Sequence, residues 1–582
     1  MRKTKIIVTL GPAVNTEDKL KSLCEAGMNV ARCNFSHGSH EENGDRIKMM
    51  RKVSAENNYN IAILVDTKGP KIRAGDVENN SLELVCNQKI ILTTEECMGN
   101  SERLYISYKK LTTLVKPGGH ILLDDGLITL KVEKILNDTE ILCVIQNTGI
   151  IKSKRGVNIP NFHIDLPNPT EKDKKDIEFA VEQDVDFIAV SFVQSADTIL
   201  QFKKILRKLG GEKIKVIAKI ENRSGMDDFD KIVKVADGVM VARGDLGVEL
   251  PLEVIPIVQK ELIRKCFMEG KPVITATQLL HSMIESPRPT RAEVSDVANA
   301  IYDLTSAVML SGESSIGKYP IKCVETLSNI ANRIESAINY KDVYIQSISR
   351  FDSSQDMTRA VTNAALTTAY EIGAKAIVTF TETGYTAQML SKMRPDMPII
   401  AITTSKKVRR QLSMNWGVFP MVGNEYHTLD EMQKDAISLS LESGLVGNGD
   451  IIVIVAGVPV GIAGATNLIK VEIVGDVLIK GIGVHPGKVT GRVCLGEIPE
   501  ELKLNFNKGD VVVVKYLHES LLPFLKQASA IIIEDDDIED RAQIIGKTLD
   551  IPIIKSAKSA YDILKEGIMV KVNSKEGTVS KI

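Results

Sequence analysis

The chain has 582 residues, of which 43% are apolar and 25% charged, a composition typical of globular proteins with several domains. Its net charge of −2 argues against a protein that binds nucleic acid or a membrane surface. The eight cysteines show no Cys-x-x-Cys spacing, and no apolar run reaches the length of a transmembrane helix. We therefore expect a soluble, cytoplasmic protein with reduced thiols.

Short apolar runs alternate with helix-like segments up to about residue 337. Eight runs are expected to be strands: 5–11, 29–36, 61–69, 187–193, 215–222, 238–245, 272–278 and 307–313. Strand–helix units keep one handedness and direction, so eight in series favour a closed parallel barrel. The fold class predicted is α/β, with a (β/α)8 barrel.

The spacing of this series is interrupted once, after the third run. Residues between Gly69 and Thr170 alternate with period two around Gly and Asn turns, which predicts an inserted all-β lid domain. The Pro- and Gly-rich segments 69–76 and 158–170 are its expected hinges.

The remainder of the chain changes character twice. A new α/β unit is expected, with strands near 376–382, 398–405, 450–457 and 468–475, followed by a Gly- and Val-rich β/α tail. The predicted domains are 1–69 with 168–340 (barrel), 70–167 (lid), 341–475 (third domain) and 476–582 (tail).

The most informative local pattern is KVIAKIEN, in which Lys219 and Glu221 are two residues apart. Side chains at i and i+2 of a strand share a face, so this ammonium and carboxylate should project together. Asp245 ends the next apolar run, and we expect it at the neighbouring strand tip. Two carboxylates suit Mg²⁺, and an adjacent ammonium suits charge on a phosphoryl group or an enolate oxygen.

Polar residues also follow the other expected barrel strands, at the end of the barrel where catalytic groups of this fold lie. They are Arg32, Asn34, Ser36, Asp66, Thr67, Lys68, Gly244, Thr277 and Ser311, with Arg73 just beyond the third strand. Arginine binds two phosphate oxygens at once, and glycine lets backbone N–H groups approach an anion closely. Together they indicate a pocket for a small anionic substrate and a metal.

Seven segments then resemble the pyruvate kinase family in order and spacing: GMNVARCNFSHG, DTKGPKIR, GVNIP, KIEN, ARGDLGVELP, SPRPTRAEVSDVANAI and SGESSIGKYP. The resemblance covers essentially residues 1–475. It implies phosphoryl transfer from phosphoenolpyruvate to ADP in glycolysis, through an Mg²⁺- or Mn²⁺-stabilised enolate. It also implies an allosteric third domain and a homotetramer.

The resemblance implies roles for individual residues. Catalysis would involve Lys219, Arg32, Thr277 and Ser311. The substrate would contact Arg32, Lys219, Gly244, Asp245 and Thr277, and the nucleotide Asn34, His37, Arg73, Lys154 and Arg155. The Mg²⁺ ligands would be Glu221 and Asp245, and the K⁺ ligands Asn34, Ser36, Asp66 and Thr67.

Position 71 departs from the K⁺-activated members, which usually carry Glu there, because this chain has Lys71. An ε-ammonium near the site can supply the positive charge of a bound K⁺. We therefore expect activity without K⁺, although K⁺ binding remains possible. The alternative is that Lys71 lies at the lid hinge and points to water.

Two further regions resemble parts of known families. TETGYTAQ resembles a phosphate-binding effector loop, and its residues Thr381, Thr383, Gly384 and Thr386 would hold a phosphorylated effector. The tail resembles the swivelling phosphohistidine domain of enzymes that use phosphoenolpyruvate, but Arg541 occupies the histidine position. A structural or regulatory tail is expected.

Two other functions remain open from the residues alone. A Mg²⁺-dependent enolate lyase or aldolase would use the same barrel and metal but no nucleotide. A non-catalytic sensor would only bind phosphorylated metabolites.

Overall fold

The computed structural model describes residues 1–160, 166–348, 356–457, 466–475, 477–536 and 541–581. The second expected hinge therefore lies partly outside the described residues, as does the tail boundary at residue 476. The chain forms two compact units. Unit 1 comprises Met1–Ser354, Ala387–Asp396 and Ser405–Pro420, and unit 2 comprises Gln355–Thr386, Met397–Thr404 and Met421–Ile582.

A closed barrel of eight parallel strands forms the centre of unit 1, which confirms the predicted fold class. Its strands, in spatial order, are β1 (Lys5–Thr9), β16 (Ala307–Leu310), β15 (Val273–Ala276), β14 (Gly238–Ala242), β13 (Lys215–Ile220), β12 (Phe187–Val190), β3 (Ala62–Asp66) and β2 (Val30–Asn34). These strands are almost entirely buried, as continuous apolar runs in a parallel sheet require.

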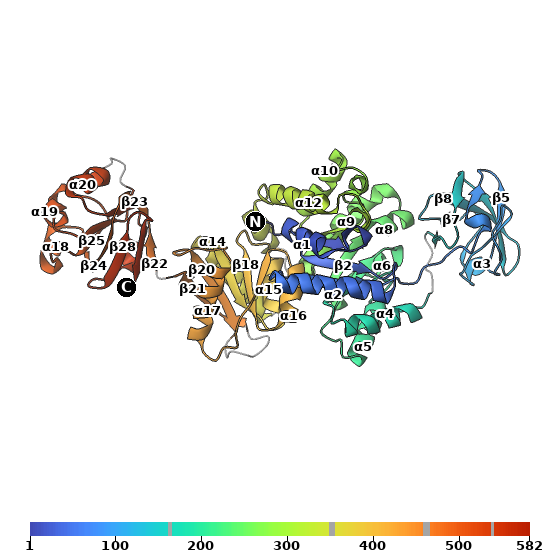
Figure 1. Ribbon diagram of the computed structural model, residues 1–582, viewed down its shortest axis with the longest axis horizontal. Helices are drawn as coiled ribbons and strands as arrows, with labels where there is room; N and C mark the ends of the chain where they lie inside the picture. Colours follow the sequence, from blue (N-terminus) through green and yellow to red (C-terminus); the bar gives the residue numbers. More distant parts are fainter. Residues whose placement is uncertain (161–165, 349–355, 458–465, 476, 537–540, 582) are drawn as a thin grey trace. The chain divides into compact units, whose positions relative to one another are not determined.

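Helices surround the barrel (Figure 1). They are α1 (Glu17–Ala26), α2 (His40–Glu56), α4 (Glu171–Glu182), α5 (Ala196–Lys208), α6 (Arg223–Asp227), α7 (Phe229–Val235), α8 (Arg243–Glu249), α9 (Ile255–Glu269), α10 (Arg291–Tyr302), α11 (Gly312–Ser315), α12 (Pro320–Glu335) and α13 (Tyr340–Ile348). Capping boxes begin three of them, at Ser39, Thr170 and Thr290. Each N-cap stabilises its helix by about 1 kcal/mol.

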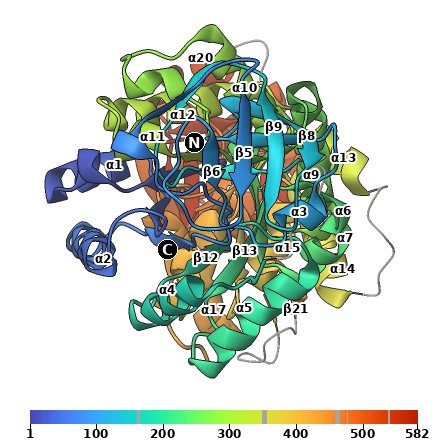
Figure 2. The same cartoon turned by 90° about the vertical axis from the view of Figure 1, so that its right-hand side faces the viewer.

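The insert after β3 is an all-β lid, as predicted, apart from the short helix α3 (Leu111–Leu114). Its six-stranded sheet runs β11 (Val157–Asn158), β7 (His120–Leu123), β8 (Ile128–Ile135), β9 (Glu140–Ile145), β5 (Lys89–Thr93) and β6 (Arg103–Tyr105), with β4 (Leu82–Leu84) and β10 (Gly149–Ile151) as a separate pair. Figure 2 shows β6, β5, β9 and β8 side by side. The lid has an apolar core of its own.

The third domain contains a five-stranded sheet in the order β19 (Val418–Val422), β18 (Ile399–Thr403), β17 (Ala376–Phe380), β20 (Ile451–Gly457) and β21 (Thr466–Ile473). Its helices are α14 (Met357–Glu371), α15 (Tyr385–Lys392), α16 (Lys406–Gln411) and α17 (Leu429–Glu442). The strand β19, at the edge of the sheet, was not predicted, and it contains Pro420. Proline lacks the N–H of a ladder bond, which weakens a strand signal in the sequence but is tolerated at an edge.

The tail in unit 2 forms an eight-stranded sheet. Its order is β22 (Val477–Lys480), β29 (Thr578–Lys581), β28 (Met569–Asn573), β24 (Lys488–Leu495), β25 (Val511–Val514), β26 (Ala530–Ile533), β27 (Ile553–Lys555) and β23 (Ile482–His485). Its helices are α18 (Pro499–Asn505), α19 (Leu522–Leu525), α20 (Arg541–Leu549) and α21 (Ala560–Ile563).

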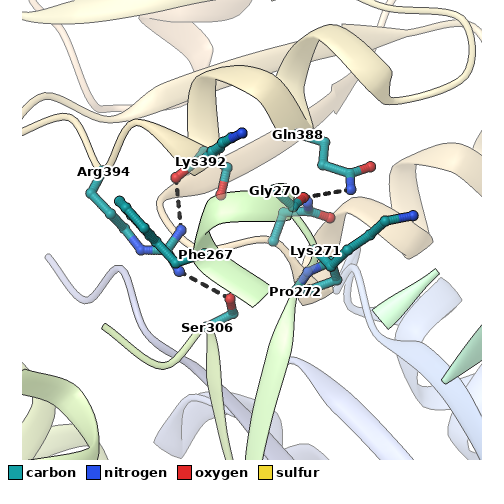
Figure 3. Close-up of a pocket in the computed structure, with 10 residues that line it drawn as sticks. Phe267, Gly270, Lys271, Pro272, Ser306, Gln388, Lys392 and Arg394 are labelled. Carbon is teal, nitrogen blue, oxygen red and sulfur yellow. Dashed lines mark hydrogen bonds between the residues drawn. The ribbon is translucent and has the colours of Figure 1, made fainter. Parts of the chain in front are cut away.

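Part of the third domain packs against the base of the barrel, at the N-terminal ends of β15 and β16. A small cavity there is lined by residues on both sides of the contact. Gln388 donates to the Gly270 carbonyl at 2.7 Å, and the buried Arg394 guanidinium donates to Ser306 Oγ at 3.1 Å and the Ser391 carbonyl at 2.7 Å (Figure 3). These bonds anchor residues 387–396 to the barrel, as their place in unit 1 requires.

All eight cysteines are free thiols, in agreement with the sequence analysis. No described helix combines the length and hydrophobicity needed to cross a membrane.

Candidate active site

Lys219 is the centre of a buried charge cluster at the mouth of the barrel. Its Nζ lies 2.9 Å from Glu221 Oε1 and 3.0 Å from Asp66 Oδ1. Burial disfavours the ammonium, but the charges of Asp66 and Glu221 outweigh it and hold the Lys219 pKa above its ordinary value. Lys219 is therefore a cation at neutral pH.

Arg32 approaches the same cluster from β2. Its NH2 and Nε lie 2.7 and 2.8 Å from Asp66 Oδ2, and its NH1 donates to Thr9 Oγ1 at 2.8 Å. Burial alone would raise the pKa of Asp66, but Lys219 and Arg32 lower it below its usual value. Asp66 therefore stays ionised and orients both cations.

Ser191, which follows β12 and was not predicted as a site residue, holds the lysine. Lys219 Nζ donates to Ser191 Oγ at 2.6 Å, and Ser191 Oγ donates to the Thr67 carbonyl at 2.7 Å. A signal existed, because the fourth predicted strand, FIAVSFV, has a serine near its end, where the neighbouring third and fifth strands were given site residues.

Glu221 follows β13, and its second oxygen accepts a hydrogen bond from the Phe192 backbone N at 2.6 Å. Burial raises the pKa of Glu221; Lys219 opposes this, while the charge of Asp245 adds to it. Asp245 also raises the pKa of Lys219. Lys219 and Glu221 are therefore in direct contact, and the charge of Asp245 acts on both of them.

The position of Asp245 needs one correction. We expected Gly244 and Asp245 at a strand end, but β14 ends at Ala242 and both residues lie in the first turn of α8. Gly244 N donates to Thr277 Oγ1 at 2.8 Å. Arg243 donates to the Thr277 carbonyl at 2.8 Å and pairs with Asp296 at 2.7 Å, which fixes this end of the helix.

The chemistry of the carboxylates fits a divalent metal with few protein ligands. Within the described ranges, no group of three or more His, Cys, Asp or Glu side chains could enclose a metal ion. Mg²⁺ is commonly bound through one or two carboxylates together with substrate oxygens and waters. The mutual charge repulsion of Glu221 and Asp245 is what such a cation would relieve.

Thr277 and Ser311 follow neighbouring strands, β15 and β16. Thr277 has a left-handed backbone, with φ of 67°, which is rare for a β-branched residue and marks local strain. Ser311 N donates to Glu313 Oε2 at 2.8 Å, and the other oxygen of Glu313 accepts from Leu280 N at 3.2 Å. The buried Glu313, also missed in the sequence, thus ties the two loops together.

The four residues expected to bind K⁺ lie at the adjacent tips of β2 and β3. Asn34 Oδ1 accepts a hydrogen bond from Ser36 N at 3.1 Å. The Thr67 carbonyl accepts one from the Ser191 hydroxyl. Lys71 Nζ, by contrast, lies 2.8 Å from Asp125 Oδ1 within the lid.

The expected nucleotide contacts on the lid are held by other lid residues. Arg73 NH1 donates to the Lys154 carbonyl at 2.8 Å, and Lys154 Nζ lies 3.5 Å from Asp76 Oδ1. Arg155 NH1 lies 3.6 Å from Asp124 Oδ1. On the barrel side, His37 follows β2 and is exposed. Its backbone N donates a hydrogen bond to the Asn34 carbonyl at 3.1 Å.

The expected effector loop lies in unit 2, before α15. Gly384 N donates to Thr381 Oγ1 at 3.0 Å, and Gly384 has φ of 88°, so the loop turns back on itself. Thr386 Oγ1 is 2.9 Å from Thr466 Oγ1, whereas Thr383 is exposed.

Three family models match successive parts of the chain: "Pyruvate kinase, barrel domain" at residues 1–324, "Pyruvate kinase, alpha/beta domain" at 359–472, and "PEP-utilising enzyme, mobile domain" at 506–577. The pyruvate kinase of Bacillus licheniformis is 46% identical over 582 residues, covering 100% of this chain and 99% of the relative. That of Geobacillus stearothermophilus is 44% identical over 579 residues, covering 99% and 98%. A solved pyruvate kinase from Cryptosporidium parvum superposes with a TM-score of 0.78 at 39% identity, covering 81% of this chain and 96% of that one.

Proposed function

The chain belongs to the pyruvate kinase family, and we propose that the cluster around Lys219 performs its phosphoryl transfer. The enzyme converts phosphoenolpyruvate and ADP into pyruvate and ATP. The observation that carries the proposal is the buried, protonated Lys219, held between Asp66 and Glu221.

Lys219 stabilises the negative charge that develops during the transfer. Its ammonium faces first the oxygens of the migrating phosphoryl group and then the enolate oxygen left on the substrate. A fixed cation in a buried site needs no reorganisation as this charge appears, which is why such groups lower barriers efficiently. Arg32 binds the phosphate of phosphoenolpyruvate beside it.

Members of this family use a divalent metal and usually K⁺. Glu221 and Asp245 would hold Mg²⁺ or Mn²⁺ here. When bound, such an ion supplies Lewis-acid stabilisation to phosphoryl and enolate oxygens. We further propose that this chain turns over without K⁺, because Lys71 supplies a positive charge near the barrel mouth when the lid cations engage substrate.

The substrate carboxylate binds at the N-terminus of α8, where the backbone of Gly244 and Asp245 and the Thr277 hydroxyl meet. Thr277 and Ser311 belong to the path that delivers a proton to the methylene carbon of the enolate. ADP binds between the barrel and the lid, through Asn34 and His37 on one side and through Arg73, Lys154 and Arg155 on the other.

Pyruvate formation from phosphoenolpyruvate with and without ADP tests the catalytic assignment. The wild-type chain should require ADP and a divalent metal, and Lys219→Met should lose turnover while still binding phosphoenolpyruvate. A lyase or aldolase would act without ADP, and a sensor would bind phosphoenolpyruvate without converting it. Either result would overturn the assignment.

We also propose a phosphorylated effector at Thr381, Thr383, Gly384 and Thr386, and a homotetramer. Loop hydroxyls and backbone N–H groups before a helix suit a phosphate group. Saturation curves for phosphoenolpyruvate, measured with AMP and a panel of sugar phosphates, test the effector. Identical curves with every compound would refute it, and sedimentation measures the subunit number.

The domain boundaries proposed are those expected from the sequence, with four domains at 1–69 with 168–340, 70–167, 341–475 and 476–582. The tail is proposed to be structural or regulatory, because Arg541 at the start of α20 cannot carry a phosphoryl group as histidine does. Incubation with phosphoenolpyruvate labelled in its phosphate should leave the tail unlabelled; a labelled tail would contradict this.

A further inference from the structure

Helix α8 connects the metal-binding residues to the lid. Its first turn contains Gly244 and Asp245, and its last residue is Glu249. Asn158, on lid strand β11, donates from Nδ2 to Glu249 Oε1 at 3.1 Å. The first turn of α8 therefore lies at the proposed active site, whereas its last residue contacts the lid.

A second lid segment lies close to the same end of α8. The turn between β7 and β8 contains Gly126, and a Cβ placed on Gly126 would lie 3.7 Å from Val248 Cγ1. The lid thus approaches α8 at two consecutive residues: it is hydrogen-bonded to Glu249 and lies near Val248.

The Asn158–Glu249 bond is not needed to fold the lid. The apolar lid core consists of residues from 72 to 166, with no contribution from α8. In the lid sheet, Asn158 pairs through its backbone with Leu122, which leaves its amide free to reach the barrel. A side chain that bonds outside its own folded domain is positioned for something other than that domain's stability.

The environment of the Asn158–Glu249 hydrogen bond makes it sensitive to the charge of the side chain at position 158. Asn158 is only 7% exposed, and its Oδ1 has no hydrogen-bond partner. Burial also raises the pKa of Glu249, which the hydrogen bond from Asn158 opposes. In a site of low polarity, exchange of the amide for a second carboxylate places like charges face to face.

The opposite end of α8 is anchored by Arg243, through Asp296 and the Thr277 carbonyl. At Glu249 the lid therefore contacts a helix whose first turn is tied to the barrel. The lid cations Arg73, Lys154 and Arg155 belong to the same folded lid as Asn158, because Arg73 forms a backbone bridge with Gly156 and donates to the Lys154 carbonyl.

We propose that Asn158 and Glu249 form a latch that holds the lid against the metal-binding helix and so positions the lid cations for the nucleotide. This inference rests on the proposed function of Lys219, Asp245 and the lid residues. Asn158 and Glu249 are positioning residues, and neither takes part in the chemistry. Loss of the latch should weaken ADP use more than phosphoenolpyruvate binding, because phosphoenolpyruvate is bound by barrel residues.

An amide–carboxylate exchange tests the latch. Asn158→Asp places a second carboxylate opposite that of Glu249. It should raise the KM for ADP by roughly tenfold or more, since two like charges that face each other are strongly unfavourable. Glu249→Gln keeps an acceptor for Asn158 and should stay within about twofold of wild type. The double variant Asn158→Asp/Glu249→Gln exchanges the two groups, restores the bond, and should recover most of the lost ADP affinity.

The control is Glu133→Gln, which removes a lid carboxylate paired with Lys89 on an exposed part of the lid sheet and should leave both KM values unchanged. Thermal unfolding shows whether each variant is folded. An unchanged KM for ADP in Asn158→Asp, or no recovery in a folded double variant, would overturn the latch.

Hydrogen exchange in β11 and the β7–β8 turn separates failure of the latch from failure of the proposed function. Asn158→Asp should exchange faster there than wild type, and the double variant should return to the wild-type rate, whether or not the chain forms pyruvate. A wild-type chain that makes no pyruvate refutes the proposed function alone. Exchange rates that do not differ between variants refute the latch alone.

Discussion

Ser191 Oγ accepts a hydrogen bond from Lys219 Nζ at 2.6 Å and donates one to the Thr67 carbonyl at 2.7 Å, so one hydroxyl fixes the ammonium relative to β3. The lysine has two carboxylate partners as well, but these belong to groups that also bind Arg32 or, as proposed, the metal. Ser191 is thus the neutral partner that orients the ammonium.

Ser191→Ala should lower kcat by roughly tenfold and leave the KM for phosphoenolpyruvate within about threefold, because orientation matters most in the transition state. Steady-state kinetics at saturating Mg²⁺ measure both constants. Ser191→Thr keeps the hydroxyl and serves as the conservative control. A rise in KM alone, with kcat unchanged, would contradict the orienting role.

Asp245→Asn should raise the Mg²⁺ concentration needed for half-maximal activity by at least about tenfold, since a neutral amide replaces one of two proposed carboxylate ligands. Titration of activity with Mg²⁺ and with Mn²⁺ gives this value. Treatment of the wild-type enzyme with EDTA should abolish turnover, and added Mg²⁺ should restore it. Retention of activity in excess EDTA would exclude the metal role.

Lys71→Glu should make turnover depend on K⁺, because a bound cation would then have to supply the charge that the ammonium provides. Activity in buffer free of Na⁺ and K⁺ should be retained by wild type and largely lost by the variant, and K⁺ should restore the variant. Lys71→Met removes the ammonium without adding a carboxylate beside Asp125, the partner of Lys71 in the lid. It therefore separates the effect of losing the cation from the effect of gaining an acid. Loss of wild-type turnover without K⁺ would refute the proposal.

Lys5 should make stability depend on pH above neutrality. Its Nζ is buried at the base of the barrel, donates to the Val418 carbonyl at 2.6 Å, and lies 4.7 Å from the centre of the Phe419 ring. Burial lowers its pKa to about 7. Between about pH 7 and the ordinary lysine pKa near 10.4, Lys5 is protonated in the unfolded chain but mostly neutral in the folded chain. The unfolded chain therefore binds more protons, so Lys5 makes the free energy of unfolding rise with pH in this range.

Lys5→Met removes that titration. Its stability relative to wild type should be most favourable near pH 7 and should decline steadily towards pH 10. Urea midpoints across this range measure the difference. Lys89→Met, which replaces an exposed lysine of the lid, is the control. A constant difference for Lys5→Met would show that the buried lysine keeps its ordinary pKa.

Several parts of the fold could be predicted because their signals are local. The eight barrel strands are apolar runs of the length that a buried parallel strand requires, and all eight are present. The lid was recognisable from its period-two alternation. The strand β19 was missed because Pro420 obscures a strand signal, and α8 was missed because the glycines of ARGDLG disguise a helix start.

The residue types near the strand ends could be read from the chain, and the i, i+2 spacing of Lys219 and Glu221 was enough to place them together. The neighbours that they meet depend on how the barrel closes. Ser191, Asp66 and Lys219 are far apart in the chain and come into contact because β3, β12 and β13 are adjacent in the closed barrel. The contact between Asn158 and Glu249 likewise depends on two domains meeting, and no periodicity or propensity within either segment encodes a distance of that kind.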